Sequence, residues 1–253
     1  MNIKKIMIYF KTCLKLQTRQ YISIFFSLFF PIILTIVFVS GVGNNGEIDG
    51  FKFINKYFFI ATTLSIIAST VLSIPLSFNF DIKLGYLKQL KLLDVNIFLF
   101  KLIDIIVSIL IIYFEILILF FFSKFIYNLD ITSINNVILS LLLLLPTIIS
   151  YAFLFTIIAL FLKKPENYMS IGITSMMILL AFSGCLGIDP NNFGGILTNI
   201  YKYIPSYYIS MPLYDLWNNG TFPYIDYFIS CLSCFILGIS IYIILYYIKL
   251  NNK

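Results

Sequence analysis

The sequence predicts an all-α integral membrane protein with six transmembrane helices, and three observations support this fold class. Of the 253 residues, 60% are hydrophobic and 11% are charged, whereas soluble domains carry about 25% charged residues. Six apolar stretches are each long enough to cross the hydrocarbon core, which takes about 20 residues. No connection is long enough to hold a soluble domain, so residues 1–253 form a single transmembrane domain. The predicted spans cover residues 21–43, 57–80, 97–122, 137–162, 169–188 and 227–248.

Residues 1–20 precede the first span and have the pattern of an amphipathic helix. The apolar residues follow helical spacing: Ile3, Ile6, Met7, Phe10 and Leu14. The basic residues take another face: Lys4, Lys11, Lys15 and Arg19. We expect this segment to lie in the membrane interface, and the alternative is a solvated basic tail.

The second span carries hydroxyl side chains at steps of three and four residues, which places them on one helical face. They are Thr62, Ser65, Ser69, Ser73 and Ser77. Small hydroxyl residues let helices pack closely and form hydrogen bonds across the interface. Such a face also suits the lining of a path for an amphipathic substrate, and the two roles are compatible.

The third span contains charged residues. Asp104 lies one turn from Lys101, so the two side chains can pair near one end of the span. Glu115 follows about three turns later on the same face, past the middle of the span. A carboxyl group at that depth must face protein or a wet cavity, and burial disfavours its charged form. A structural hydrogen bond to another helix is favoured over a proton relay.

Between the fifth and sixth spans, Gly and Pro interrupt two aromatic segments that are too short to cross a membrane. They run from Phe182 to Pro190 and from Tyr203 to Trp217. These segments indicate a short re-entrant or interfacial helical hairpin, with its Trp and Tyr residues at the depth of the lipid headgroups.

The basic residues predict the orientation of the spans. Twelve lie on the same side as the N-terminus: Lys4, Lys5, Lys11, Lys15, Arg19, Lys83, Lys88, Lys91, Lys163, Lys164, Lys249 and Lys253. Four lie on the other side: Lys52, Lys56, Lys124 and Lys202. The positive-inside rule then predicts a protein of the cytoplasmic membrane with both termini in the cytoplasm. The net charge of +6 reflects this topology, and no basic patch indicates binding to nucleic acid.

Several chemistries are disfavoured. Histidine is absent, which removes the usual general base and metal ligand. Cys231 and Cys234 form a C-x-x-C pattern inside the sixth span, where small residues commonly pack between helices. No G-x-x-x-x-G-K-[ST] motif occurs, so the chain has no ATPase site of this kind. We therefore expect no catalytic site, no metal site and no bound cofactor.

Several motifs resemble the membrane subunit of type-2 ABC transporters, a class that includes exporters of drugs, bacteriocins and polysaccharides. The resemblance covers nearly the whole chain. The opening Phe10–Leu16 with Phe29-Phe30-Pro31 resembles the start of that family. The loop Gly85–Leu93 resembles its Gly-x-Leu loop, with Lys101 as the basic residue that opens the third span. Three further segments resemble the family's fifth-span exit and outer hairpin: Ser183-Gly184, Tyr203-Ile204-Pro205 and Tyr214-Asp215.

The resemblance implies a mechanism. Two six-span subunits, this chain with a second copy of itself or a related permease, pair about a two-fold axis in the bilayer. Each rests on a separate P-loop ABC ATPase, which binds ATP and Mg. The loop between spans 2 and 3 is the coupling segment, with leucine anchors inside a basic rim. Its residues are Leu84, Gly85, Leu87, Lys88, Leu90 and Lys91.

The resemblance also places the substrate pathway near the two-fold axis, where spans 2 and 5 face each other. Candidate lining residues are Thr62, Ser65, Ser69, Ser73, Met176, Met177 and Phe182. They suit export of a hydrophobic or amphipathic substrate, such as a drug, an antimicrobial peptide or bacteriocin, or a lipid-linked molecule. One alternative is a proton-coupled carrier that uses Glu115, and a weaker one is a polytopic membrane enzyme.

The six-span topology can be tested by cysteine labelling. We expect single cysteines introduced near Asn128 and near Asn219 to react with an impermeant thiol reagent added from outside the cell. Labelling of either position from the cytoplasmic side only would contradict the six-span topology.

Overall fold

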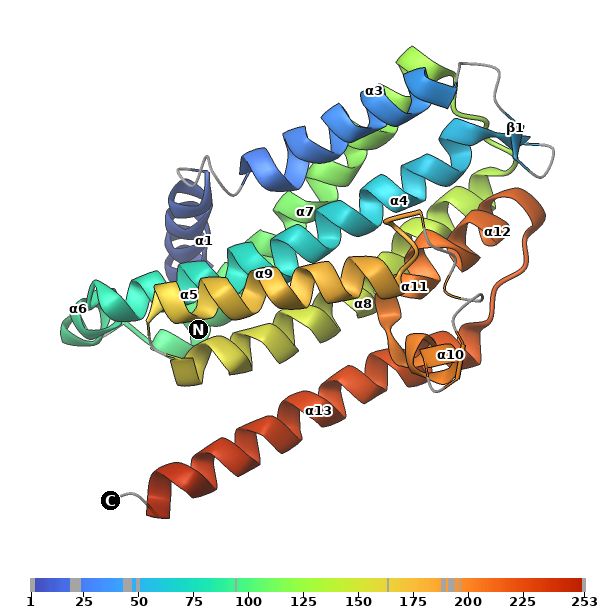
Figure 1. Cartoon of the computed structure of the whole chain (residues 1–253). Helices are drawn as coiled ribbons and strands as arrows, with labels where there is room; N and C mark the ends of the chain where they lie inside the picture. Colours follow the sequence, from blue (N-terminus) through green and yellow to red (C-terminus); the bar gives the residue numbers. More distant parts are fainter. Residues whose placement is uncertain are drawn as a thin grey trace.

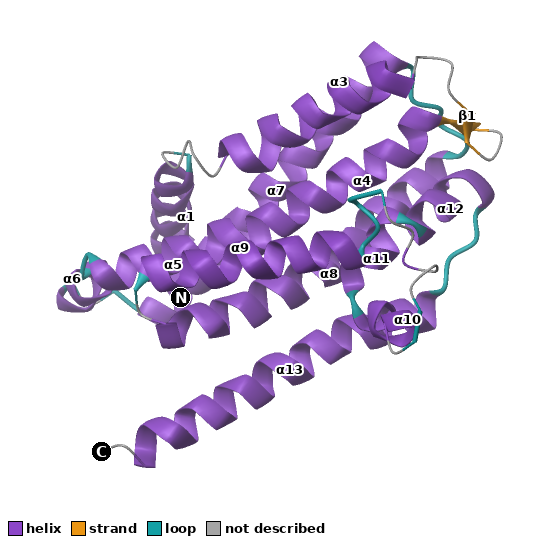
Figure 2. Cartoon of the chain, in the orientation of Figure 1, coloured by secondary structure: helices purple, strands orange, loops and turns teal. Residues whose placement is uncertain are grey.

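We analysed a computed structural model of the chain. It describes residues 3–18, 24–42, 47–48, 51–93, 95–162, 164–187, 190, 194–195 and 197–251. Within these residues the regular secondary structure is helical apart from β1 and β2, two-residue strands that pair antiparallel (Figure 2). The elements are α1 (Ile3–Gln17), η1 (Phe25–Phe29), α3 (Phe30–Val42), β1 (Glu47–Ile48), β2 (Phe51–Lys52), α4 (Phe53–Ile67), η2 (Ala68–Ser73), α5 (Ile74–Lys83), α6 (Tyr86–Leu92), α7 (Ile97–Tyr127), α8 (Ile134–Leu162), α9 (Pro165–Phe182), α10 (Leu197–Ile200), η4 (Tyr201–Tyr203), α11 (Pro205–Ser210), α12 (Pro212–Asn219) and α13 (Tyr224–Asn251).

The all-α membrane fold predicted from the sequence is confirmed. Among the described residues, four helices are long and apolar enough to cross a membrane, at 53–83, 99–127, 134–162 and 224–244. A shorter apolar helix covers Ser27–Gly41. Helix α9 has 18 residues and lies where the fifth span was predicted. The exact number of six crossings therefore stays a prediction.

The helices run between two ends of an elongated bundle (Figure 1). Helices α1 and α6 and the far end of α13 lie at one end, on the left in Figure 1. The β1 strand and helices α10 and α12 lie at the opposite end. We call these the α6 end and the β1 end. The long helices run between these ends in alternating directions: α3, α4–α5, α7, α8, α9 and α13. This arrangement agrees with both termini lying on one side of a membrane.

The helix formed by α4, η2 and α5 is the centre of the bundle. In its most apolar stretch 78% of the residues are buried, compared with 33% in α7 and 28% in α13. Thr62, Ser65 and Ser69 of its hydroxyl face are buried inside the protein. Small side chains allow neighbouring helices to approach closely, which explains why this helix, and not a more apolar one, is surrounded by the others.

Two segments of π-helix, η1 and η2, interrupt the α-helical pattern, and each precedes a proline by two residues. Their wider turns appear in the hydrogen bonds from Phe30 N–H to Phe25 O and from Ile74 N–H to Ser69 O. Pro31 and Pro75 cannot donate a hydrogen bond to the carbonyl four residues earlier, and their rings crowd it. For Pro75 that carbonyl belongs to Val71, and the Tyr168 hydroxyl of α9 donates a hydrogen bond to it.

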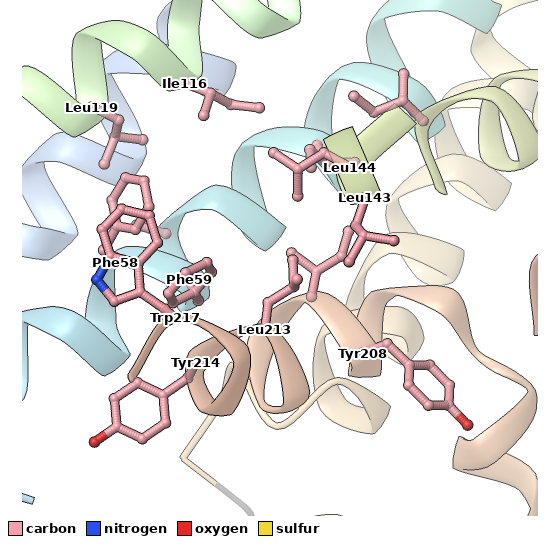
Figure 3. Close-up of a cluster of buried hydrophobic side chains, with 14 of the residues drawn as sticks. Phe58, Phe59, Ile116, Leu119, Leu143, Leu144, Tyr208, Leu213, Tyr214 and Trp217 are labelled. Carbon is pink, nitrogen blue, oxygen red and sulfur yellow. The ribbon is translucent and has the colours of Figure 1, made fainter. Parts of the chain in front are cut away.

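The main hydrophobic core lies toward the β1 end, around Trp217 of α12 (Figure 3). The Trp217 indole packs against Phe58, Phe59 and Phe120, with ring centroids 5.5–6.2 Å apart. Its Nε1 donates a hydrogen bond of 2.8 Å to the carbonyl of Asp130. The sequence suggested a tryptophan facing lipid headgroups. The side chain is instead buried, because the aromatic rings of α4 and α7 offer it a dry pocket and a loop carbonyl satisfies its N–H.

The predicted helical hairpin between spans 5 and 6 is present as α11 and α12. Helix α9 ends at Phe182, earlier than the predicted residue 188, because Gly184 adopts a left-handed conformation with φ of 77°. Ser206 of α11 exchanges hydrogen bonds with the Tyr151 hydroxyl of α8, at 2.9 and 3.1 Å. These contacts hold the hairpin inside the β1 end of the bundle.

Helix α13 packs on α8, where Phe153 and Phe235 have ring centroids 5.2 Å apart. Cys231 and Cys234 are both buried and are free thiols. Cys231 belongs to the main core and Cys234 to a second cluster that includes Tyr151 and Phe155 of α8. The two cysteines therefore pack between helices, as their spacing indicated.

We expect Gly172 to control how closely α9 approaches the central helix. A Cβ atom at this position would lie 2.8 Å from Leu72 Cδ2 and 3.3 Å from a ring carbon of Tyr168. Gly172→Val should therefore push α9 outward and lower stability by about 1–3 kcal/mol. Thermal unfolding of the purified protein measures this change. Gly41→Val is the matched control, since nothing lies within 4 Å of a Cβ there, and an equal loss of stability in both variants would contradict the prediction.

Candidate functional site

At the α6 end, a tight turn connects the central helix to α6. Gly85 has a φ of 70°, a left-handed conformation that other residues adopt only with strain. Its carbonyl accepts hydrogen bonds from the N–H groups of Lys88 and Gln89, at 3.0 and 3.2 Å, and these begin α6. The glycine of the predicted coupling loop is thus required by the reversal of the chain after α5.

Helices α1, α6 and α7 meet in one hydrophobic cluster, the α1–α6–α7 cluster. Its buried members are Cys13, Leu90, Phe100, Ile103 and Val107. The Phe100 ring makes edge contacts with Tyr9 of α1 and with Tyr86 of α6, at centroid distances of 5.8 and 6.1 Å. Burial raises the pKa of the Cys13 thiol to about 12. The thiol therefore stays protonated and acts as a packing group.

The structure separates the leucines of the predicted coupling segment into two groups. Leu90 is 8% exposed and lies in the α1–α6–α7 cluster, so it faces its own chain and is not available as an anchor for a partner. Leu84, Leu92 and Leu93 are 74%, 84% and 73% exposed. Lys88 and Lys91 are exposed beside them. The side chain of Leu87 lies outside the described residues.

A charged cluster joins the central helix, α7 and α1. Lys101 Nζ lies 3.1 Å from Asp104 Oδ2, which confirms the predicted pair, and 2.5 Å from Asp81 Oδ2 of α5. Gln17, in the last turn of α1, donates to Asp104 Oδ1 at 2.8 Å and to Ser108 Oγ at 2.6 Å. Sequence reasoning missed Asp81. Asp81 follows directly after the predicted span 2, at the same end of the bundle where Lys101 begins span 3. That shared position is the signal that could have identified Asp81.

Glu115 is 3% exposed and lies where three helices meet. Its Oε1 accepts a hydrogen bond of 2.6 Å from Ser27 of η1, and its Oε2 accepts one of 3.4 Å from Ser69 of η2. The expected hydrogen bonds from Glu115 to other helices are therefore present. A cavity of about 40 Å³ adjoins the carboxyl group and extends to Gln17 and Ser108.

The hydroxyl face of the central helix is divided by depth. Thr62 and Ser65 are buried within the chain, while Ser73 and Ser77 join Ser69 in lining the Glu115 cavity. Within this chain the face serves helix packing and a small polar cavity. Its role in a substrate pathway stays a prediction.

Helix α9 contributes the other predicted lining residues, and they point in different directions. Met176 is buried against the central helix and α8, Phe182 is half-buried and Met177 is exposed. Ser170 and Thr174 are exposed on α9 as well. By contrast, the exposed large side chains along α7 are apolar: Leu102, Ile106, Leu110, Phe114, Leu117, Phe121, Phe125 and Ile126. The α7 face suits lipid, whereas the α9 face mixes hydroxyl and apolar groups.

A larger cavity, of about 590 Å³, opens near the β1 end between the start of α13 and the segment from α10 to α12. Its walls include four tyrosines: Tyr201, Tyr203, Tyr207 and Tyr208. Lys202 and Asp226 contribute charged groups to it. Sequence reasoning had noted the aromatic character of this interval but did not indicate a cavity, which forms only because α13 returns beside it.

A comparison with protein-family models matches residues 46–247 to the family described as "ABC-2 family transporter protein". The match covers the central helix, the α6 turn and helices α7 to α13 up to residue 247. No curated protein matches the chain. Because the family model covers well over half of its residues, this multi-pass membrane protein belongs to the ABC-2 family of transporter proteins.

Proposed function

We propose that this chain is the permease subunit of an ATP-driven exporter, with the α6 end in the cytoplasm. A separate P-loop ABC ATPase, which binds ATP and Mg, would dock on α6. The observation that carries this proposal is the group of exposed leucines at the α6 end. ABC-2 permeases work with an ABC ATPase partner, and this end of the chain offers a surface for one.

The docking surface consists of Leu84, Leu92 and Leu93, with Lys88 and Lys91 around them. The leucines are at least 73% exposed, although they lie beyond the end of the membrane-crossing helix 53–83. Large apolar side chains gathered in an aqueous region are unfavourable unless a partner covers them. A short helix with apolar anchors inside a basic rim fits a groove on a partner subunit.

The α1–α6–α7 cluster would transmit movement of α6 to the membrane helices. Leu90 and Tyr86 connect α6 to Phe100 of α7 and to α1. The Lys101 cluster begins at the next residue of α7 and connects α7 to α5. A displacement of α6 by the ATPase therefore moves packed side chains and ion pairs on both the second and the third span.

The exposed face of α9 supports a pathway beside this helix. Ser170, Thr174 and Met177 face outward from the chain. The Ser170 and Thr174 hydroxyls each donate a hydrogen bond to the carbonyl four residues earlier in α9. Their oxygens can still accept hydrogen bonds, which a polar path would supply and lipid tails would not. We propose that α9 faces the second permease of a pair and that substrate passes between them.

The same face supports a hydrophobic or amphipathic substrate. The exposed residues of α9 combine hydroxyls with Ile173, Met177 and Ile178, and methionine adapts to irregular apolar ligands. A drug, an antimicrobial peptide or bacteriocin, and a lipid-linked molecule all meet this description. Membership in the ABC-2 family favours a transport subunit over a proton-coupled carrier or a membrane enzyme. Co-purification of an ATPase with the chain distinguishes the permease from both.

We expect Leu92→Asp and Leu93→Asp to release the ATPase or to uncouple ATP hydrolysis from transport. A carboxylate buried in the docking surface would cost several kcal/mol, while the spans still insert normally because these residues lie outside them. ATPase pull-down and substrate-stimulated hydrolysis in purified membranes measure the effect.

Lys88→Ala is the control for the docking surface, since charges at the rim contribute little affinity. Leu90→Asp should behave differently and lower the thermal stability of the permease itself, because Leu90 is buried in its own fold. Full retention of ATPase binding and coupling in both Leu92→Asp and Leu93→Asp would show that α6 is not the docking element.

A bulky side chain on the exposed face of α9 should obstruct transport. We expect Thr174→Trp to lower the transport rate strongly while ATPase binding is retained, because the indole would fill the proposed path. Ile106→Trp, on the apolar exposed face of α7, is the matched control and should leave transport nearly unchanged. Equal transport by the two variants would place the pathway elsewhere.

A further inference from the structure

We propose that Glu115 is a proton-binding site that exchanges its proton with the solution through the cavity beside α1. The proposal concerns a buried carboxyl group, a polar cavity that adjoins it, and the segment at which the cavity ends. It does not depend on the ATPase or on the identity of the substrate.

In the part of the chain that the structure describes, the surroundings of the carboxyl group contain no compensating charge. Among the described residues none forms an ion pair with Glu115. Its partners are the neutral hydroxyls of Ser27 and Ser69. A buried carboxylate with only neutral partners retains the cost of an uncompensated charge, and binding a proton removes that cost. Both oxygens are already oriented by hydroxyl groups that can donate or accept, so either protonation state finds hydrogen-bond partners.

The cavity provides the route. Its polar lining consists of Gln17, Ser27, Ser69, Ser73, Ser77 and Ser108, together with Glu115 itself. Ile24, Ile74, Ile111 and Ile112 complete the lining. The cavity of about 40 Å³ has room for about three water molecules, each of which needs two to four polar partners. Hydroxyls on three sides supply those partners. Water in the cavity would connect the carboxyl group to Gln17 by hydrogen bonds.

The far end of the cavity adjoins the interfacial helix. Gln17 belongs to the last turn of α1 and contacts Asp104 and Ser108. The charged groups beyond it are Asp104 and Lys101 on α7 and Asp81 on α5, and Lys101 pairs with both aspartates. Toward the cavity, α1 contributes Gln17, η1 contributes Ser27 and η2 contributes Ser69. The charged groups are therefore satisfied by one another, which leaves Glu115 as the titratable group among the described residues of the cavity lining.

The two π segments give the site a means of responding to helix movement. Ser27 lies in η1 and Ser69 lies in η2, and π segments occur frequently at functional sites. If either segment returned to a regular α-helix, the residues after it would rotate by about 100° relative to those before it. A movement of the central helix would thus remove a hydroxyl from Glu115 and change its preference for the proton.

Infrared spectroscopy of the full chain in lipid nanodiscs tests the proposal. We expect the wild type to show a protonated carboxyl band that Glu115→Gln lacks, and the band should weaken as the pH is raised. On transfer to D₂O the band should shift promptly, because the proton exchanges. Glu115→Gln should keep the thermal stability of the wild type, since the amide still forms hydrogen bonds, and Glu115→Leu should lower it.

Gln17→Leu tests the route. We expect the carboxyl band to remain and its shift in D₂O to slow by about tenfold or more, because an apolar side chain interrupts the chain of polar groups. Gln89→Leu, the same change on the exposed surface of α6, is the control and should exchange as the wild type does. Absence of the Glu115 band at every pH would overturn the proton site. A band that does not shift in D₂O, or equal exchange in Gln17→Leu and wild type, would overturn the route.

Discussion

The structure depends on satisfying the backbone carbonyl that Pro75 leaves without its helical partner in the central helix 53–83, which is buried on nearly all sides. Pro75 removes one backbone hydrogen bond in the middle of this helix, and η2 widens the helical turn before it. The Tyr168 hydroxyl donates to the Val71 carbonyl, and Gly172, one turn further along α9, allows the helices to lie close enough for this bond. Within a bilayer no water can replace that donor, so the position of α9 and the shape of the central helix are determined together.

The same constraint explains the polar groups on α7. Glu115 is satisfied by serines from two other helices, and Lys101 by aspartates from its own helix and from α5. Each polar group therefore holds a pair of helices together where apolar packing alone would not choose between neighbours. The hydrophobic cores occupy different places: the main core surrounds Trp217 toward the β1 end, and the α1–α6–α7 cluster lies at the α6 end. The Glu115 cavity adjoins the α6 half of the bundle, where polar contacts add to the packing of the α1–α6–α7 cluster.

The proposed coupling to an ATPase agrees with this division. At the β1 end the α11–α12 hairpin and the buried tryptophan pack into the main core, which makes this end suitable as a rigid part of the permease. The α6 end has a small cluster that ties α6 to α1 and α7, and it has exposed leucines. A partner that moves α6 acts on the polar contacts of the central helix before it acts on the main core. This order suits a subunit in which ATP hydrolysis on another chain must change helix positions inside the membrane.

The sequence by itself determined the helical membrane fold, the N-terminal amphipathic helix, the short hairpin, the Lys101–Asp104 pair and the resemblance to the ABC-2 family. Hydropathy, helical spacing and turn residues are local properties, and these features depend on them. Only the tertiary structure decided that Leu90 faces inward and Leu92 outward, that Asp81 joins Lys101, that Trp217 is buried, and that serines from two π segments meet Glu115. Those contacts join residues between 20 and more than 150 positions apart, and a helical pattern specifies which residues share a face but not which neighbouring helix that face meets.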